Sequence, residues 1–226
     1  MSGVTGRSSP GALRSDDLDR PSSSLDLRPD LKLIVDLVPE KSRVLDIGCG
    51  NGDLLFELQR VRNVDARGVE LSMDGVYACV TRGLSVVQGD ADADLVTYPA
   101  ASFDVAILSH TLQAIFDPRG VIDHLVRIAR YAIVSFSNFG YWKVRWSLLT
   151  TGRMPLIGTH DRNWWDTPNI RACTISDFVL LCRDMGISID KMLIVNEHGR
   201  ARIGHPGRAA NILGEQAVFV LSRSPE

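Results

Sequence analysis

A glycine-rich stretch carries the strongest chemical signal in this sequence. It contains three alternate glycines, Gly48, Gly50 and Gly52, directly after a hydrophobic run. Glycines at a strand-to-helix turn let ligand atoms approach backbone that a Cβ atom would obstruct. The dinucleotide-binding pattern GxGxxG does not fit, because Asp53 occupies the position of its third glycine. Since Asp46 and Asp53 would repel a pyrophosphate, the loop suits a ligand with a cationic amino-acid end.

Two further acidic residues stand where successive strands are expected to end. Glu70 follows Asp46 by 24 residues, and a carboxylate there can accept both hydrogens of a ribose diol. Asp90 follows the next expected strand, where an adenine amino group could donate to it. With the glycines, these residues predict a site for S-adenosylmethionine (SAM) or S-adenosylhomocysteine, although an ordinary tight turn with Glu70 as a solvated helix cap would also explain them. The predicted cofactor-binding residues are Asp46, Gly48, Gly50, Gly52, Glu70, Leu71, Asp90, Ala91 and Ser109.

His110 is the only obvious general base near the expected site. The strand before it would place it close to a transferable methyl group, and a base there can remove a proton from a methyl acceptor. A ring packed over the adenosine, or hydrogen-bonded to backbone, explains His110 at least as well. The five histidines show no HExxH spacing and the four cysteines form no CxxC pair, so we expect no metal site and reduced thiols.

Short β-branched runs alternate with helical patterns along most of the chain. This alternation predicts an α/β fold with a single doubly wound, Rossmann-like sheet of about seven strands, covered by helices on both faces. The last two strands could form an antiparallel edge. The expected strands cover residues 43–47, 66–71, 85–88, 103–109, 131–137, 192–197 and 216–221. The expected helices cover residues from about 30 to 38, 53–61, 72–82, 118–130 and 175–185.

The first 24 residues differ in composition from the rest of the chain. They are rich in serine, glycine and proline and hold few apolar side chains, so burial cannot offset the entropy of ordering them. We therefore predict a disordered tail over residues 1–24 and one SAM-binding domain over residues 25–226.

An unusually long connection lies within this domain, at residues 138–174. It holds all four tryptophans, Trp142, Trp146, Trp164 and Trp165, together with several arginines. Three interpretations remain open for this insertion. Trp142 and Trp146 could pack a helix onto the sheet while the other pair plugs the core, the segment could be a lid over a small-molecule pocket, or it could bind a protein partner, since Trp and Arg are enriched at interface hot spots.

Charge and hydropathy exclude several classes of function. The 25 Lys and Arg residues and 27 Asp and Glu residues give a net charge of -2, so no global basic field is available to hold a nucleic acid. No apolar run is long enough for a membrane helix, and the N-terminus lacks the apolar stretch of a secretory signal. We expect a cytoplasmic protein that binds neither nucleic acid nor membrane.

The acidic and glycine motifs resemble those of the class I SAM-dependent methyltransferase fold. The sequence is more closely similar to the methionine-biosynthesis family MetW, over residues 27 to about 222. The segments that carry this resemblance are 27–31, 44–52, 107–113, 134–142, 152–155 and 166–178. Three residues depart from the family pattern: His110 replaces Gln, Ser137 replaces Pro and Arg171 replaces His.

The MetW resemblance implies a partner or activator of homoserine O-acyltransferase, with a methyltransferase-like domain that binds SAM. The chain has no GxSxG nucleophile elbow, so acyl transfer would need the partner's nucleophile. SAM is a downstream product of methionine, so a SAM-binding subunit could couple pathway output to acylation. A stand-alone SAM-dependent methyltransferase acting on a small molecule is the alternative. The glycine spacing argues against a nicotinamide-dependent dehydrogenase.

Overall fold

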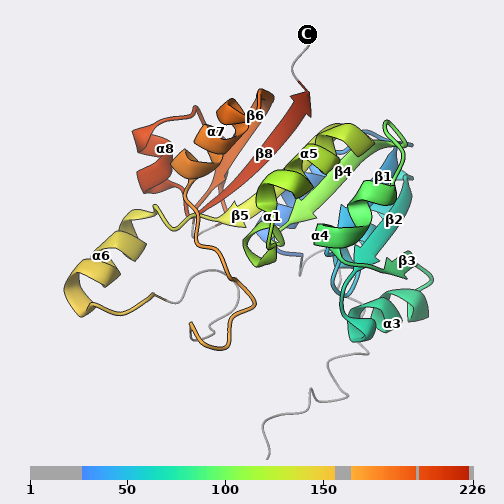
Figure 1. Cartoon of the computed structure of the whole chain (residues 1–226), viewed down its shortest axis with the longest axis horizontal. Coiled ribbons are helices and arrows are strands. Elements are labelled where there is room, and N and C mark those ends of the chain that lie inside the picture. Colours follow the sequence, from blue (N-terminus) through green and yellow to red (C-terminus); the bar gives the residue numbers. More distant parts are fainter. Residues whose placement is uncertain (1–26, 156–163, 197–198, 224–226) are drawn as a thin grey trace, which may run out of the picture.

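A single mixed sheet organises the protein (Figure 1). The computed structural model describes residues 27–155, 164–196 and 199–223, so the predicted N-terminal tail lies outside the described residues. The strand order is β3-β2-β1-β4-β5-β8-β6-β7. The strands are β1 (Arg43–Ile47), β2 (Asp65–Glu70), β3 (Ser85–Gln88), β4 (Phe103–Ser109), β5 (Ala129–Ser137), β6 (Ile187–Val195), β7 (Ala201–Ile203) and β8 (Gln216–Arg223).

The strand directions confirm a doubly wound α/β sheet with an antiparallel end. β3, β2, β1, β4 and β5 pair in parallel, whereas β8 is antiparallel to both β5 and β6. The predicted pairing of the last two long strands is therefore confirmed, but β8 lies inside the sheet rather than at its edge. The described strands number eight and not seven, because β7 adds a short exposed edge beside β6. Three exposed residues are too few to give a strand periodicity in the sequence.

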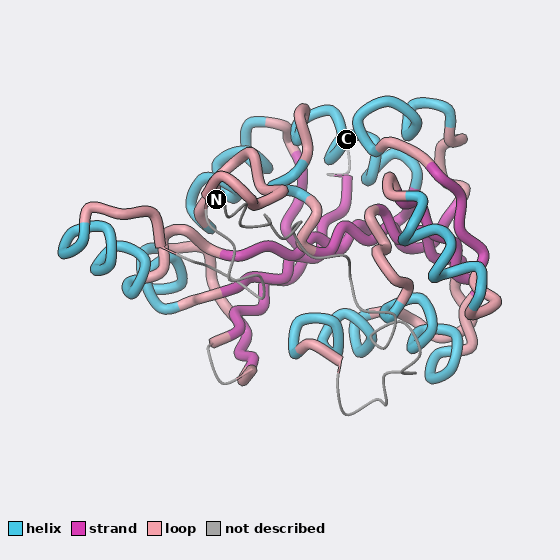
Figure 2. The backbone as a smooth tube through the Cα atoms, turned by 90° about the horizontal axis from the view of Figure 1, so that it is seen from below, coloured by secondary structure: helices cyan, strands magenta, loops and turns pink. Residues whose placement is uncertain are grey.

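Helices cover both faces of the sheet, as Figure 2 shows. Apolar side chains of α1 and α2 pack on one face, and those of α5 and α7 pack on the other. Successive residues of a strand point to opposite faces, so Val44 and Ile107 belong to the first core and Leu45 and Leu108 to the second. The helices are α1 (Pro29–Leu37), α2 (Asp53–Arg62), α3 (Met73–Thr81), α4 (Ala91–Asp94), α5 (Pro118–Ile128), α6 (Trp142–Thr151), α7 (Ile175–Asp184) and α8 (Arg208–Leu213).

Local sequence explains where α5 begins, and tertiary pairing explains where it ends. The Asp117 side chain accepts a hydrogen bond from the Gly120 amide, and Pro118 occupies the first turn. The helix ends at Ile128, two residues before the predicted end, because Ala129 already pairs with Phe103 as the start of β5.

The insertion differs most from what the sequence suggested. Helix α6 projects away from the sheet (Figure 1), and its only buried residue is Val144. The exposed fractions of Trp142 and Trp146 are 45% and 62%, so the interpretation that they pack α6 onto the sheet is wrong. Trp164 and Trp165 are also exposed, and their rings contact each other edge to face with centroids 5.8 Å apart, so they do not plug the core.

The described residues give two further findings. All four cysteines are free thiols, in agreement with the prediction. None of the described helices combines the length and the apolar character that a bilayer crossing requires.

Candidate functional site

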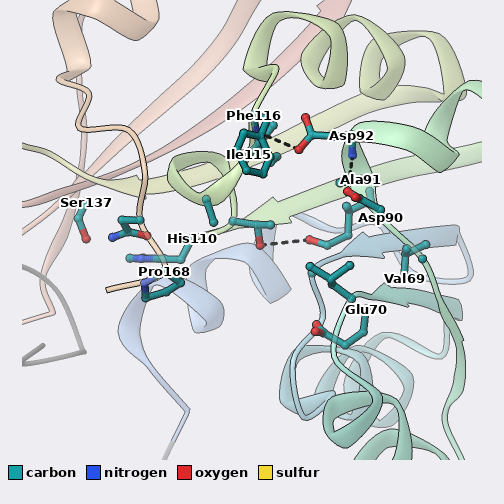
Figure 3. Close-up of a pocket in the computed structure, with 17 residues that line it drawn as sticks. Val69, Glu70, Asp90, Ala91, Asp92, His110, Ile115, Phe116, Ser137 and Pro168 are labelled. Atoms are coloured by element: carbon teal, nitrogen blue, oxygen red, sulfur yellow. Dashed lines mark hydrogen bonds between the residues drawn. The ribbon is translucent and has the colours of Figure 1, made fainter. Parts of the chain in front are cut away.

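Two adjoining cavities open at the carboxyl ends of the parallel strands. The first encloses about 310 Å³ beside β2 and the loop after β3, and the second encloses about 390 Å³ beside β1 and the start of α1. They share Gly48, His110 and Thr111 as lining residues, so they adjoin, and we call the two together the crevice. This is the position at which doubly wound sheets bind ligands. Figure 3 shows Glu70 on one side of the first cavity and His110 with Pro168 on the other.

The three glycines of the loop have different roles in this crevice. All three have positive φ angles, of 72° at Gly48, 56° at Gly50 and 78° at Gly52. A Cβ atom on Gly48 would overlap the Thr111 side chain, and one on Gly52 would overlap Leu84. A Cβ atom on Gly50 would meet nothing within 4 Å. Gly48 and Gly50 line the cavities, whereas Gly52 packs against the chain between α3 and β3.

Glu70 connects the end of β2 to the glycine loop. Its Oε2 accepts a hydrogen bond of 2.8 Å from the Gly50 amide, and its Oε1 accepts one of 2.9 Å from the Ser72 amide. These bonds fix the carboxylate at the border of the first cavity, next to the exposed side chain of Leu71. Each oxygen keeps a further lone pair, so the group retains the capacity to accept hydrogen bonds from a diol.

Asp46 is a buried carboxylate with an incomplete set of hydrogen bonds. It is 2% exposed, and its Oδ1 has no hydrogen-bond partner among the described residues. Burial and the charge of Glu70 raise the pKa of Asp46 to about 7, although the Arg28 guanidinium opposes the shift. An unsatisfied buried acceptor is costly, and Asp46 lines the second cavity. A cationic group bound there would satisfy it, so this end of the crevice fits the ammonium of a methionyl group.

The loop after β3 supplies the far wall of the first cavity. Asp90 caps α4 by accepting a hydrogen bond of 2.9 Å from the Asp92 amide. Asp92 in turn accepts hydrogen bonds from the amides of Phe116 and Asp117, as Figure 3 shows in part. Asp90, Ala91 and Asp92 all line the cavity, and the sequence analysis predicted the first two.

The start of α1 contributes charged residues that the sequence analysis did not assign to the site. The Arg28 guanidinium donates to Asp30 Oδ2 and to Ser109 Oγ, both at 3.3 Å. His110 Nε2 lies 3.3 Å from the same Asp30 oxygen. Burial opposes ionisation of Asp30, but His110 and Arg28 outweigh it and lower the pKa of Asp30. The sequence showed Arg28 and Asp30 as an ordinary helix start, because nothing local indicates contact with a strand about 80 residues later.

Part of the insertion closes the first cavity. Pro168 and Asn169 line it. The amides of Ile170 and Arg171 donate to Gln113 O, at 2.9 and 3.0 Å, and the Arg171 guanidinium donates to the carbonyls of Ile115 and Phe116. The lid interpretation therefore fits residues 168–171, while α6 stands apart from the crevice.

Comparison with known proteins identifies the relatives of this chain. A family model described as "Methionine biosynthesis protein MetW" matches residues 28–221. The bifunctional methionine biosynthesis protein MetXA/MetW of Rhodopirellula baltica is 32% identical over 210 residues, which cover 89% of this chain. The chain spans only 34% of that relative's length. The ubiquinone biosynthesis O-methyltransferase of Paraburkholderia phymatum is 30% identical over 130 residues, 53% of this chain and 56% of that protein.

Solved structures agree on the architecture. A SAM-dependent methyltransferase from Thermotoga maritima, described as a possible histamine N-methyltransferase, superposes with a TM-score of 0.65 at 21% identity. The superposition covers 87% of this chain and 88% of the other. The likeness shows the class I SAM-dependent methyltransferase fold, in agreement with the fold predicted from the sequence.

Proposed function

The chain belongs to the MetW family of methionine biosynthesis proteins, and from this premise we propose that it binds SAM and is a partner or activator of a homoserine O-acyltransferase. The relative whose name joins MetXA and MetW in one bifunctional protein carries the partner assignment. Joining two modules in one polypeptide raises their effective concentration, which is useful where the two act together. The absence of a GxSxG elbow from this sequence agrees with an acyl-transfer nucleophile that resides on the partner.

The crevice supports SAM or S-adenosylhomocysteine as the ligand. The first cavity has acidic residues where a ribose and an adenine would need acceptors, and the second has the unsatisfied Asp46 where an ammonium group would bind. The two cavities adjoin at Gly48, as a nucleoside joined to an amino acid requires. When bound, SAM would supply either an activated methyl group or a signal of methionine-pathway output.

Calorimetric titration with S-adenosylhomocysteine tests the cofactor. We expect Glu70→Ala to weaken binding by roughly ten- to a hundredfold, because a charge-assisted hydrogen bond is worth about 1.5–3 kcal/mol. Glu40→Ala is the matched control, since Glu40 is exposed and lies in neither cavity. Equal affinity in wild type and Glu70→Ala would remove Glu70 from the site. No binding by the wild type would refute the cofactor itself.

Co-purification from the native cell tests the partner. We expect a homoserine O-acyltransferase to be retained by the full chain, and its acyl-transfer rate to change when the purified chain is added. We assign the contact to the exposed face of α6 formed by Trp142, Trp146 and Leu149, an apolar face on the insertion that the sequence analysis singled out. Retention of no acyltransferase, with an unchanged rate, would refute the partner role.

A stand-alone methyltransferase acting on a small molecule is the second candidate. His110 favours it, because its side chain lines both cavities and lies against the buried carboxylate of Asp30, an arrangement that can orient a general base. A methylated product formed by the isolated chain would establish this activity.

A further inference from the structure

An open hollow of about 690 Å³ lies at the amino ends of the parallel strands. Its lining contains the first residues of β1, β4 and β5, together with the last residue of β8, which runs in the opposite direction. The crevice lies at the carboxyl ends of the same parallel strands, and the two share no lining residue. The hollow is therefore a separate feature of the surface, which we call the basic hollow for the arginines that line it.

Four arginines and one carboxylate line the basic hollow. Asp104 on β4 is the carboxylate, and the arginines are Arg43 on β1, Arg127 on α5, Arg130 on β5 and Arg223 on β8. Hydrogen bonds from Arg43 lower the pKa of Asp104, so Asp104 is ionised and four positive charges stand against one negative charge. The whole chain has a net charge of -2, so this excess of positive charge is a local property of the surface.

The fold fixes two of these guanidinium groups and leaves part of each unused. Arg43 donates to both oxygens of Asp104, from Nε at 3.4 Å and from Nη2 at 3.3 Å. Arg127 donates to the carbonyls of Tyr98 and Leu95, at 2.7 and 2.9 Å. A guanidinium carries five N–H donors, so each side chain keeps further donors for a ligand. Because both side chains are already held in place, binding costs little conformational entropy.

Arg130 and Arg223 are less engaged by the fold. The Arg130 guanidinium lies 5.3 Å from the centre of the Tyr131 ring, and it has no ion pair within 4 Å among the described residues. Arg223 Nη2 donates to Asp123 at 3.2 Å, and Asp123 lies outside the lining. Both arginines are exposed, so both are accessible to a ligand from solvent.

Helix electrostatics explains only one of the four arginines. Arg127 lies in the last turn of α5, where a basic side chain is favourable because it meets unpaired carbonyls and the negative end of the helix dipole. Arg43, Arg130 and Arg223 lie on strands, so the dipole gives no reason for them to gather here. Like charges placed together repel, and a bound anion would relieve this repulsion.

We propose that the basic hollow binds a small polyanion, a molecule that carries two or more phosphate or carboxylate groups. Guanidinium groups match the paired oxygens of both kinds of group. A single exposed ion pair contributes little, so several arginines are needed to bind several anionic groups at once. The volume lies within the range of small-molecule sites, about 300–1,000 Å³, and Phe103 and Val126 in the lining can contact the body of an organic ligand. The site is independent of the proposed SAM binding, since it shares no residue with the crevice.

Calorimetric titration of the full chain with pyrophosphate and with citrate tests this site. The two probes separate the sources of negative charge, since pyrophosphate carries phosphate groups and citrate carries carboxylates. We expect at least one of them to bind at about 50 mM salt, and its affinity to fall severalfold at about 300 mM salt, because exposed charges are screened. The probe that binds more tightly identifies the kind of anionic group that the hollow prefers.

Arg130→Gln is the main variant, because Arg130 is exposed and its loss does not disturb the core. We expect Arg130→Gln to weaken binding by about fivefold and Arg130→Glu by roughly twentyfold, since the second change reverses the charge. Arg223→Gln is a second, independent variant, with an expected loss of about threefold. Arg60→Gln is the matched control and should bind as wild type does, because Arg60 is exposed, pairs with Glu57 and lies outside the hollow.

Three results would overturn the assignment. The first is that neither probe binds the wild type at low salt. The second is that folded Arg130→Glu and Arg223→Gln proteins bind as tightly as wild type, which would place the anion elsewhere. The third is that a hexaglutamate peptide binds at least about tenfold more tightly than both probes, which would make the hollow a docking surface for an acidic protein segment. Affinity for S-adenosylhomocysteine should be equal in all these proteins, so a wild type that binds pyrophosphate or citrate but no S-adenosylhomocysteine would refute the proposed cofactor alone.

Discussion

The crevice and helix α6 differ from ordinary protein interiors and surfaces in opposite ways, because the crevice buries a charged group and α6 exposes apolar ones. In the crevice, the carboxylate of Asp46 is buried and lacks partners. On α6, Trp146 and Leu149 expose apolar side chains to solvent, with exposed fractions of 62% and 78%. Each departure costs stability in the isolated chain. A small polar ligand would relieve the cost of burying the Asp46 carboxylate, and a protein surface would relieve the cost of exposing Trp146 and Leu149. The two regions of this one domain therefore suit two different kinds of partner.

The largest effect is expected at Gly48, which lines the crevice and also packs tightly against Thr111. Gly48→Ala should lower the free energy of unfolding by about 2–4 kcal/mol, because the new Cβ overlaps Thr111 and the backbone is left-handed. Gly50→Ala has only the backbone cost, about 1 kcal/mol, since its Cβ meets no atom within 4 Å. Gly50→Ala should nevertheless lose S-adenosylhomocysteine affinity, because Gly50 lines the second cavity and its amide bonds Glu70.

Urea unfolding and calorimetry of these two variants check the prediction. Equal stability losses would mean that Thr111 moves aside without cost. Unchanged affinity in Gly50→Ala would mean that the ligand does not approach this part of the loop.

The next effect concerns α6. Trp146→Ala should weaken binding of the acyltransferase by about 2 kcal/mol or more, roughly thirtyfold. The melting temperature should hardly change, because most of the Trp146 side chain contacts solvent. Tyr77→Ala is the matched control, since Tyr77 is an exposed aromatic residue on α3. Surface plasmon resonance with immobilised acyltransferase measures both variants, and equal affinity for Trp146→Ala and wild type would place the interface elsewhere.

A smaller effect, dependent on pH, tests the buried charge in the crevice. The pKa of Asp46 is raised to about 7, above its unfolded value, so the folded state loses stability from this group as the pH rises from about 4 to 7. An ammonium ligand binds the ionised form. Affinity for S-adenosylhomocysteine should therefore rise by about tenfold between pH 5.5 and 7.0.

The groups around Asp46 support the view that Asp46 itself is the residue that titrates in this pH range. Glu70 raises its pKa and Arg28 lowers it, while burial raises the pKa of the neighbouring Cys49 thiol, which stays neutral in this range. Calorimetry across the pH range should show the rise in wild type and a flat profile in Asp46→Asn. A rise of the same size in Asp46→Asn would assign the titration to another group.

The sequence predicted those parts of the molecule whose determinants are local. The bounds of β1 and β4 agree with the prediction to the residue, because buried apolar runs end there in turn-forming residues. The sequence predicted that Glu70 and Asp90 lie near each other, and both line the first cavity, because strand ends of a parallel sheet converge on one edge. Arg28 and Asp30 were not assigned to the site, because their contacts with Ser109 span 81 and 79 residues and arise only from packing.

The sequence also could not predict that the tryptophans of the insertion are exposed. The i, i+4 spacing of Trp142 and Trp146 describes one face of a helix, but it does not say whether that face meets the sheet or the solvent. The interpretation that Trp164 and Trp165 plug the core was wrong for the same reason, since both are exposed.

The smallest effect is expected at His110, the residue that would matter most if the crevice performed acid-base chemistry. His110 has a left-handed backbone, with φ of 55°, and its Nε2 faces Asp30 at 3.3 Å. The amide nitrogen of Gln can donate to the same carboxylate, and Gln is the residue that the MetW resemblance implies at this position.

His110→Gln should therefore bind S-adenosylhomocysteine within twofold of wild type and restore growth to a methionine auxotroph lacking this protein. An amide does not titrate and cannot replace a general base, so a folded His110→Gln variant that binds ligand but fails to restore growth would favour a methyltransferase. His110→Ala, which removes the imidazole beside Asp30, is the control that separates loss of that contact from loss of a base.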